Sequence, residues 1–302
     1  MQALNRRRFL TLSAVALLPL PARAAPQITQ WHGQALGAAA AIYLAHPDAD
    51  AIITRAVAEI ARLEDIFSLY RTTSALSQLN ATGRLDAPPF ELLECLALCD
   101  RVGNATGGRF DPTIQPIWQL YATSYAAGQA PAAADLSAAL NRVGFDRIRY
   151  DADAVTLAPG MSLTLNGIAQ GFIADKLAEL LASEGLTDIL INTGEFRALG
   201  RMPGADAWPV KLVSGGEVPL AARALATSSP LGTVFDAAGK VGHIIDPSSG
   251  LPAPARWTSV SLSAPSAALA DALSTAACLM ADRQTVQDAL HPFPDTRIEA
   301  LV

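Results

Sequence analysis

Apolar residues recur at helical spacing in several stretches of the chain. In residues 48–67, Ile53, Val57, Ile60 and Phe67 follow one another at intervals of three, four or seven positions, which places them on one helix face. Comparable spacing predicts further helices over residues 89–105, near 135–143, and over 168–183 and 267–280. Each of these helices would bury its apolar face against a core.

Short runs with alternating or β-branched residues predict strands between and after these helices. They cover residues 147–150, 154–157, 162–165, 189–192, 210–213, 243–245, 259–263 and 297–302. Residues 70–80 are polar and turn-like, and the alanine-rich residues 126–134 are expected to form a surface loop. The order of helices and strands lacks a regular βαβ alternation, so the sequence predicts an α+β fold with mixed, mostly antiparallel sheets and packed helices.

The first 24 residues have the features of an export signal. Arg6-Arg7 with Arg8-Phe9-Leu10 resembles the twin-arginine motif, residues 12–20 are apolar, and Ala22-Arg23-Ala24 is a small-x-small cleavage site. The apolar stretch is too short to span a bilayer. We therefore expect residues 1–24 to be a signal peptide and residues 25–302 a mature periplasmic domain. An N-terminal anchor that is retained is the alternative.

Composition narrows the class of protein. A hydrophobic share of 51% with 17% charged residues is typical of a globular chain. The formal net charge of −6 argues against nucleic acid as a partner, because phosphate binding needs clustered lysine and arginine. Cys95 and Cys99 are four positions apart on a predicted helix, which is poor disulfide geometry, so with Cys278 they are expected to be buried thiols.

No common cofactor motif occurs in the sequence, which lacks GxGxxG, GxxxxGK[ST], HExxH and GxSxG. The clearest candidate for chemistry is Asp271 with Thr275. Their i, i+4 spacing puts a carboxylate and a hydroxyl one turn apart on one helix face, and hard oxygens of this kind suit Mg²⁺. The alternative is an acid favoured by the helix dipole and a hydroxyl bonded to the preceding turn.

Two glycine-containing segments are candidates for binding a nucleotide. Gly107-Gly108, followed by Phe110, Asp111 and Thr113, could let backbone approach a ligand closely, with Asp111 as an acceptor, although a helix end followed by a turn explains the same residues. Residues 166–171 join a strand to a helix, so their N–H groups could face a pyrophosphate. Tight packing of strand and helix is the alternative there.

His243 begins a short apolar run that ends in a turn at Asp246-Pro247-Ser248-Ser249-Gly250. A single histidine in such a run is either structural or a general acid or base. The four histidines of the chain are far apart in sequence, so a zinc site of several histidines is not indicated.

Taken in order, these motifs resemble one family, the ApbE-like FAD:protein FMN transferases. The resemblance covers residues 33–280 and rests on six landmarks: Phe67-Ser68-x-Tyr70 with Ser74 and Leu79-Asn80; Gly107-Gly108-x-Phe110-Asp111-Pro112-Thr113; Gly167-Ile168-Ala169-x-Gly171; Ala226-Thr227-Ser228; His243-Ile244-Ile245-Asp246-Pro247; and Asp271-Ala272-Leu273-x-Thr275. It implies two lobes around an FAD cleft. It also implies an Mg²⁺-dependent cleavage of the FAD pyrophosphate, which releases AMP and leaves FMN on a threonine or serine hydroxyl of a partner flavoprotein, expected to be membrane-associated and to face the periplasm.

The resemblance also assigns roles to individual residues. Mg²⁺ would be held by Asp271, Thr275 and the carbonyl of Gly167, and His243 and Asp246 would be catalytic. FAD would be bound by Gly107, Gly108, Phe110, Asp111, Thr113, Asn166, Gln170, Glu195, Thr227 and Ser228.

Some residues depart from the family pattern. Gln170 stands where lysine is usual and Asn166 where glycine is usual, and Thr193-Gly194-Glu195 replaces Gly-Gly-Asp. Glutamine keeps hydrogen-bonding capacity but removes a cation. These features resemble the NosX branch, which serves nitrous oxide respiration. Two alternatives to an enzyme stay open: a periplasmic FAD-binding accessory without transferase activity, and an unrelated solute-binding protein.

Overall fold

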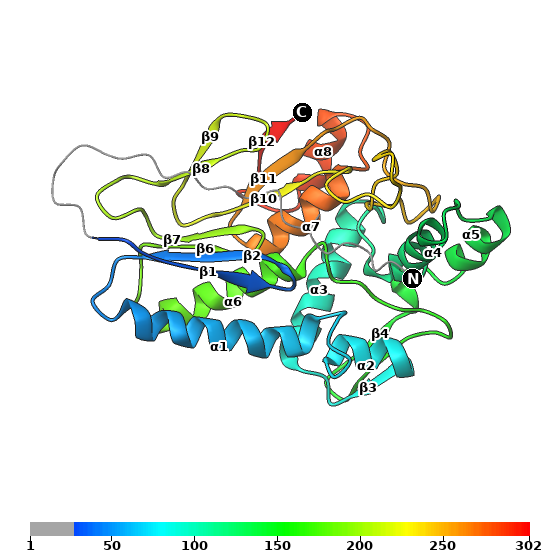
Figure 1. The fold of residues 1–302 in the computed structure, drawn as a ribbon, viewed down its shortest axis with the longest axis horizontal. Coiled ribbons are helices and arrows are strands. Elements are labelled where there is room, and N and C mark those ends of the chain that lie inside the picture. Colours follow the sequence, from blue (N-terminus) through cyan, green and yellow to red (C-terminus); the bar gives the residue numbers. More distant parts are fainter. Residues whose placement is uncertain (1–26) are drawn as a thin grey trace.

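Seven antiparallel strands form the central sheet of the computed structural model, which describes residues 27–302 (Figure 1). In their order across the sheet, the strands are β1 (Thr29–Ala35), β2 (Ala38–Leu44), β6 (Ile189–Asn192), β7 (Phe196–Leu199), β10 (Ala224–Ser228), β11 (Val260–Ala264) and β12 (Arg297–Leu301). Two small antiparallel sheets accompany it: β3 (Arg84–Asp86), β5 (Ala154–Thr156) and β4 (Arg149–Tyr150) in one, and the hairpin of β8 (Trp208–Lys211) and β9 (Glu217–Leu220) in the other. The predicted α+β class with antiparallel sheets is confirmed.

Eight α-helices lie within the described residues. They are α1 (Ala49–Phe67), α2 (Ala75–Thr82), α3 (Phe90–Ala105), α4 (Gln115–Ala126), α5 (Ala133–Leu140), α6 (Ala169–Ser183), α7 (Ala267–Ala277) and α8 (Arg283–Leu290). Two 3₁₀ turns, η2 (Pro112–Ile114) and η3 (Phe145–Arg147), flank α4 and α5. The five helices predicted from periodicity correspond to α1, α3, α5, α6 and α7, although α7 ends before residue 280.

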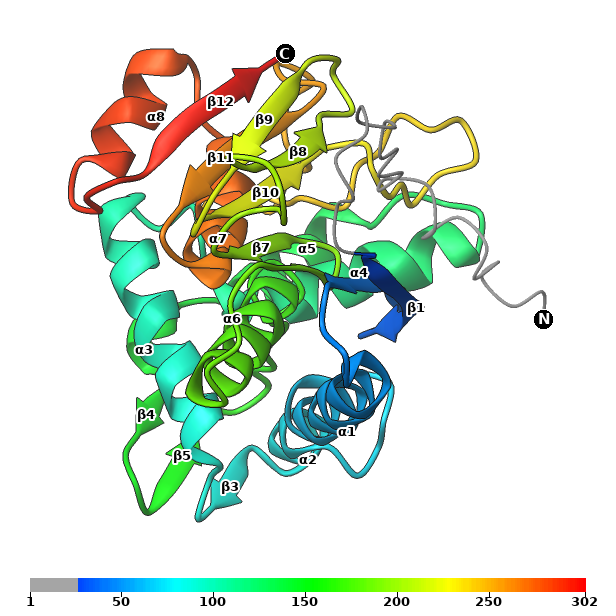
Figure 2. The same ribbon diagram turned by 90° about the vertical axis from the view of Figure 1, so that its left-hand side faces the viewer.

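Both faces of the central sheet are covered. Helices α1, α6 and α7 pack on one face, where Ile42 and Ile191 point into the main core. The β8–β9 hairpin covers the other face, where Tyr43 and Leu190 contact the fully buried Trp208. Figure 2 shows α1 and α6 on one side of the sheet and the hairpin on the other. Alternate residues of β2 and β6 are therefore buried in different cores, which explains why these strands have no polar face.

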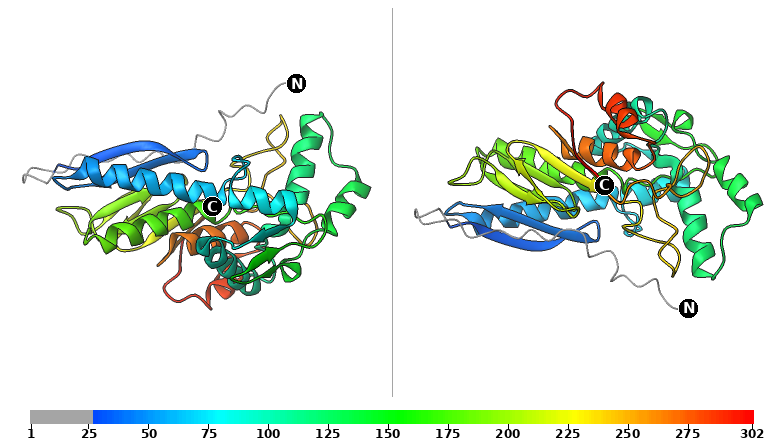
Figure 3. Two further views of the ribbon diagram at one scale, coloured as in Figure 1. Left: turned by 90° about the horizontal axis from the view of Figure 1, so that it is seen from below. Right: turned by 90° about the horizontal axis from the view of Figure 1, so that it is seen from above.

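A second, smaller lobe lies at the end of the molecule away from the hairpin (Figure 3). Helices α4 and α5 pack there against the loop of residues 229–258. Its core is aromatic: the ring of Phe235 lies 5.3 Å from Trp118 and 5.4 Å from Tyr121, between centroids. The protein thus has two lobes, each with its own apolar cluster.

The prediction of a turn over residues 70–80 is wrong in its second half, which is helix α2. Ser74 caps this helix by accepting from the N–H of Ser77 at 3.1 Å, and Gly83 ends it with a positive φ of 74°. A polar helix of two turns has too little apolar periodicity to stand out from a turn.

The predicted strands over residues 162–165 and 243–245 are also wrong. Asn80 occupies the place of a neighbouring strand, since its side-chain amide accepts from the N–H of Leu163 at 2.7 Å and donates to the same residue's carbonyl at 2.8 Å. Residues 243–245 make only isolated bridges on either side, from Gly242 to Val234 and from Ile245 to Pro252. Side chains and loops satisfy the backbone there instead of a ladder.

The signal peptide predicted for residues 1–24 lies outside the described residues. None of the helices in residues 27–302 combines the length and the apolar composition that a membrane-spanning helix needs. The three cysteines are buried and free, as predicted.

Candidate active site

The beginnings of helices α6 and α7 meet at close range and place the candidate residues. A Cβ atom on Gly171 would lie 2.3 Å from the carbonyl oxygen of Ala267, so only glycine permits this approach. Asp175 of α6 caps α7, because its carboxylate accepts from the N–H groups of Ala267 and Ala268 at 2.9 Å and from the hydroxyl of Ser266 at 2.7 Å. An acid at a helix N-terminus is stabilised by the unpaired N–H groups there.

Asp271 is one turn further along α7 and is only 4% exposed. Its Oδ2 accepts from the N–H of Gly171 at 3.3 Å, and burial raises its pKa to about 7. Thr275 follows on the same face. A Cβ on Gly167 would lie 3.1 Å from Thr275 Oγ1 and 3.4 Å from the ring of Phe110. The structure therefore brings Phe110, Gly167, Asp271 and Thr275 into one corner.

Glu195 lies beside this corner, directly before the first residue of β7. It is 8% exposed, and burial together with the nearby charge of Asp271 raises its pKa well above the ordinary value for a glutamate. Its Oε2 accepts from the N–H of Thr227 at 3.1 Å. Gln170 packs against Gly194, where a Cβ would lie 2.5 Å from the glutamine Oε1, and the hydroxyl of Thr193 donates to the Gln170 carbonyl at 2.7 Å.

Serine and threonine hydroxyls line the junction of β10 and α7. Thr227 Oγ1 lies 2.8 Å from Ser261 Oγ, and Ser228 Oγ lies 2.7 Å from Ser274 Oγ and 3.3 Å from Thr275 Oγ1. Thr227 and Ser228 are sequence candidates, whereas Ser261 and Ser274 were not found from the sequence. The one available signal was the position of Ser274 directly before Thr275.

The carboxyl groups of the site have few cationic partners, so the site could accept a cation. The buried carboxyl groups of Glu195 and Asp271 lie near the half-buried Asp175, and of these three only Asp175 has a cationic partner, with Arg197 Nε 3.1 Å from its Oδ1. No group of three or more Asp, Glu, His or Cys side chains in residues 27–302 is arranged to hold a metal. A cation here would thus rely on the Asp271 carboxylate, the Thr275 hydroxyl, the Gly167 carbonyl and substrate oxygens. Mg²⁺ commonly uses one or two carboxylates and substrate phosphates, so the residues fit.

The segment from Gly107 to Thr113 divides into two parts. Gly107 and Gly108, with φ of 60° and 77°, are exposed and end helix α3, as the structural alternative predicted. Asp111 accepts from the N–H and hydroxyl of Thr113 at 2.8 and 2.6 Å and from the N–H of Phe145 at 3.2 Å. The oxygens of Asp111 therefore hold its own loop against η3.

His243 and Asp246 belong to the small lobe. His243 Nδ1 lies 3.0 Å from the carbonyl oxygen of Thr233, and burial lowers the pKa of its ring below the usual 6.5. Asp246 Oδ1 accepts from the N–H and hydroxyl of Ser248 at 2.8 and 2.6 Å. These bonds stay within the loop of residues 229–258. Asn166, next to Gly167, is exposed.

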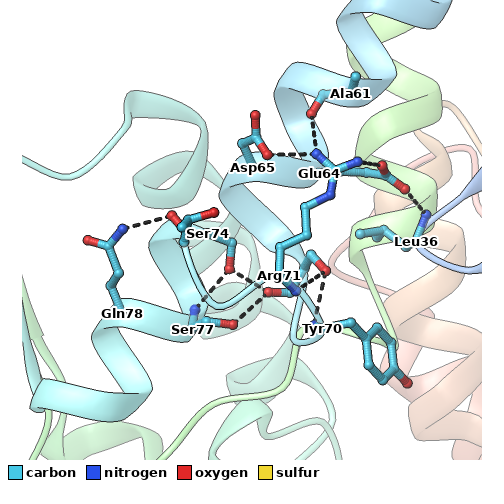
Figure 4. A network of polar contacts seen from close by, with 11 residues as sticks. Leu36, Ala61, Glu64, Asp65, Tyr70, Arg71, Ser74, Ser77 and Gln78 are labelled. Carbon is cyan, nitrogen blue, oxygen red and sulfur yellow. Dashed lines mark hydrogen bonds and ion pairs between the residues drawn. The ribbon is translucent and has the colours of Figure 1, made fainter.

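The first landmark is held by a polar network (Figure 4). Arg71 pairs with Glu64 and, at 2.6 Å, with Asp65, while Glu64 also accepts from the N–H of Leu36 at 2.7 Å. Ser68 Oγ accepts from the N–H of Tyr70 at 3.0 Å, and the Tyr70 side chain is 69% exposed. The network therefore fixes a short loop that presents an aromatic side chain.

Two surface hollows of about 400 and 420 Å³ lie elsewhere on the protein. One is lined by residues of α8 and β12, and the other by residues of β1 and α1. Neither hollow is lined by any of the carboxylates and hydroxyls that gather at the starts of α6 and α7.

Comparisons with known proteins agree with this geometry. The model of the ApbE family matches residues 29–296. An FAD:protein FMN transferase of Treponema pallidum is 30% identical over 299 residues, which cover 82% of this chain and 81% of that protein. An enzyme of the same name from Klebsiella pneumoniae is 29% identical over 67% of each chain.

Solved structures show the same architecture. The apo crystal structure of the flavinyl transferase ApbE from Pseudomonas stutzeri superposes with a TM-score of 0.77 at 25% identity, over 87% of each chain. The ApbE protein of Thermotoga maritima has the same fold, with a TM-score of 0.81 at 24% identity over 91% of this chain and 94% of that one. From the family match over almost all of the described residues, the chain belongs to the ApbE family.

Proposed function

We propose that this chain is an FAD:protein FMN transferase that depends on Mg²⁺. A threonine or serine hydroxyl of an acceptor flavoprotein attacks the phosphorus of the FMN half of FAD. The bond from that phosphorus to the bridging oxygen breaks, AMP leaves with the bridging oxygen, and the hydroxyl loses its proton. The convergence of Gly167, Asp271 and Thr275 beside the buried carboxyl group of Glu195 carries the proposal, together with membership of a family of such transferases.

Asp271, Thr275 and the Gly167 carbonyl would hold the metal ion. When bound, Mg²⁺ supplies neutralisation of the pyrophosphate charge and polarises the reacting phosphorus. The N–H of Gly171 holds Asp271 in place at 3.3 Å. The N-terminal turn of α6, which begins at Ala169, favours an anion such as the pyrophosphate.

His243 is the proposed group that takes the acceptor's proton. A carbonyl oxygen can only accept, so the contact with Thr233 requires Nδ1 to carry the ring proton. Burial is the largest cause of the lowered pKa of the His243 ring, and hydrogen bonds with the carbonyls of Thr233 and Pro230 act against it. The lowered pKa favours the neutral imidazole, which is the form that can take up a proton. The small lobe would bring this ring toward the acceptor hydroxyl.

The test uses the mature chain, residues 25–302, with FAD, Mg²⁺ and candidate acceptor flavoproteins. AMP release and in-gel fluorescence of the acceptor should appear together and disappear in Asp271→Ala. Asp288→Ala, a surface acid on α8, is the matched control and should keep both signals. Binding of FAD without AMP or labelled acceptor, with any acceptor, would identify the chain as an FAD-binding accessory instead.

Export and the acceptor's identity form part of the same proposal. The twin-arginine motif and the cleavage site support a periplasmic enzyme, and the resemblance of residues 165–171 and 192–195 to the NosX branch supports an acceptor used in nitrous oxide respiration. Replacing Arg6 and Arg7 by lysine should stop accumulation in the periplasm. Accumulation that is unchanged in this variant would argue against the twin-arginine route.

A further inference from the structure

Three hydroxyls and one carbonyl form a chain of contacts behind the candidate cation site. Thr275 Oγ1 lies 3.3 Å from Ser228 Oγ, which lies 2.7 Å from Ser274 Oγ. Ser274 Oγ in turn lies 3.0 Å from the backbone carbonyl oxygen of Asp271. The chain therefore begins at one proposed cation ligand and ends on the backbone of another.

The carbonyl at its end gives this chain a direction. A carbonyl oxygen can only accept, so Ser274 must donate its single proton to Asp271. Ser274 then accepts from Ser228, whose own proton is thereby used. Ser228 can therefore only accept from Thr275. With its proton directed at Ser228, Thr275 keeps its lone pairs for other partners.

We infer that Ser274 is a positioning residue for the cation site, which acts through Ser228 to orient the Thr275 hydroxyl as an oxygen ligand. The inference rests on the proposed function, because it assumes that Thr275 binds the cation. Without a fixed direction, the Thr275 proton could point at the cation, and a proton facing a cation is repelled by it.

Because the Ser274 hydroxyl is buried, the donor–acceptor order of these hydrogen bonds is maintained. Ser274 is 0% exposed, so water cannot replace its partners when its hydroxyl is removed. The pair joins two elements, since Ser228 ends β10 and Ser274 lies on α7. Groups behind a metal ligand commonly set ligand orientation, and their loss typically lowers metal affinity by about 10- to 100-fold.

The test measures binding of Mn²⁺ by the loss of the free Mn²⁺ signal in electron paramagnetic resonance, without FAD and with it. Ser274→Ala should raise the Kd for Mn²⁺ about tenfold. Ser228→Ala should raise the Kd for Mn²⁺ by a similar factor. Because Ser228 is less buried than Ser274, this variant still tests the inference if Ser274→Ala fails to fold. Ser263→Ala is the matched control, because Ser263 is a buried hydroxyl on β11 with partners Arg223 and Glu299 outside the site. Its Kd should match the wild type.

The double variant, with Ser228→Ala and Ser274→Ala combined, shows whether the two serines affect Mn²⁺ binding through one hydrogen-bonded chain or independently. If Ser274 acts through Ser228, Ser274→Ala adds nothing once Ser228 is alanine, so the double variant should bind Mn²⁺ as either single variant does. Additive losses would overturn the inference, as would a wild-type Kd in Ser274→Ala. Asp271→Ala tests the proposed cation site separately from the positioning role of Ser274. If Asp271→Ala also binds like the wild type, the proposed cation site itself fails.

Discussion

Replacing Gly171 by alanine should force helices α6 and α7 apart. The added Cβ would lie 2.3 Å from the carbonyl oxygen of Ala267, 2.5 Å from its carbonyl carbon and 2.7 Å from the nitrogen of Ala268. All three are backbone atoms, so no side chain can turn away to relieve the overlap. To restore an ordinary carbon–oxygen contact distance, the two helices must move apart by about 1 Å.

The size of the effect follows from three contributions. Overpacking costs about 1–3 kcal/mol, and disturbing the Asp175 cap costs about 1–2 kcal/mol. Alanine in place of glycine inside a helix returns about 1 kcal/mol. We therefore expect the free energy of unfolding to fall by about 1–4 kcal/mol, which at about 2 °C per kcal/mol lowers Tm by about 2–8 °C.

The assay is thermal unfolding of the mature chain followed by circular dichroism, with AMP release measured in parallel. Activity should fall as well, because the same shift moves the Gly171 N–H away from Asp271. Ser183→Ala, on the exposed end of α6, is the control and should stay within about 0.5 kcal/mol of the wild type. A Gly171→Ala protein with wild-type Tm and AMP release would refute the reasoning.

Three other perturbations test separate parts of the protein. Asn80→Ala removes both bonds to the backbone of Leu163 and should lower the free energy of unfolding by about 2–3 kcal/mol in urea titrations, with Gln78→Ala on the exposed face of α2 as the control. His243→Asn should flatten the fall of Tm with decreasing pH: because the folded pKa is below 6.5, this histidine stabilises the fold fully above pH 6.5 and loses that contribution as the pH falls. EDTA should abolish AMP release, and added Mg²⁺ should restore it.

Each of these has an outcome that contradicts it. Equal urea midpoints for Asn80→Ala and Gln78→Ala would show that the Asn80 amide does not replace a strand. Parallel Tm curves for the wild type and His243→Asn between pH 7 and 5 would show that His243 is not held neutral by burial. AMP release that persists after exhaustive chelation would remove the metal from the proposed reaction.

Local patterns in the sequence were sufficient wherever a feature depends on residues close in the chain. The periodicity of residues 48–67 and 168–183 predicts α1 and α6 almost to the residue, since a helix buries one face. The i, i+4 spacing of Asp271 and Thr275 likewise predicts their common face on α7. The family resemblance implies that Gly167 lies close to Thr275. Their positions in the sequence, 108 residues apart, do not predict this proximity.

Elements without a one-sided pattern were missed. Strand β2 has the sequence AAAAIYL and is buried on both faces, so no polar alternation marks it. Helix α4 belongs to the small aromatic lobe, whose partner loop is more than 100 residues further along the chain. Residues 162–165 have the pattern of a strand, but Asn80, 83 positions away, supplies the hydrogen bonds to the backbone of Leu163, and the N–H of Thr164 donates to the carbonyl of Pro112.

The sequence by itself determined helices α1, α3, α6 and α7 of the main core, the antiparallel α+β class, the buried thiols and the residue types of the site, because these depend on periodicity and on motifs in order. Only the tertiary structure decided the pKa values of those residues and the direction of the hydrogen bonds between them. Burial, together with the nearby charge of Asp175, raises the pKa of Asp271. Burial, together with the charge of Asp271, raises the pKa of Glu195, which lies 76 residues away in the sequence. The direction of the Ser274 hydroxyl chain comes from contacts between β10 and α7. Charge and hydrogen-bond direction depend on which groups exclude water together, and folding alone brings those groups into contact.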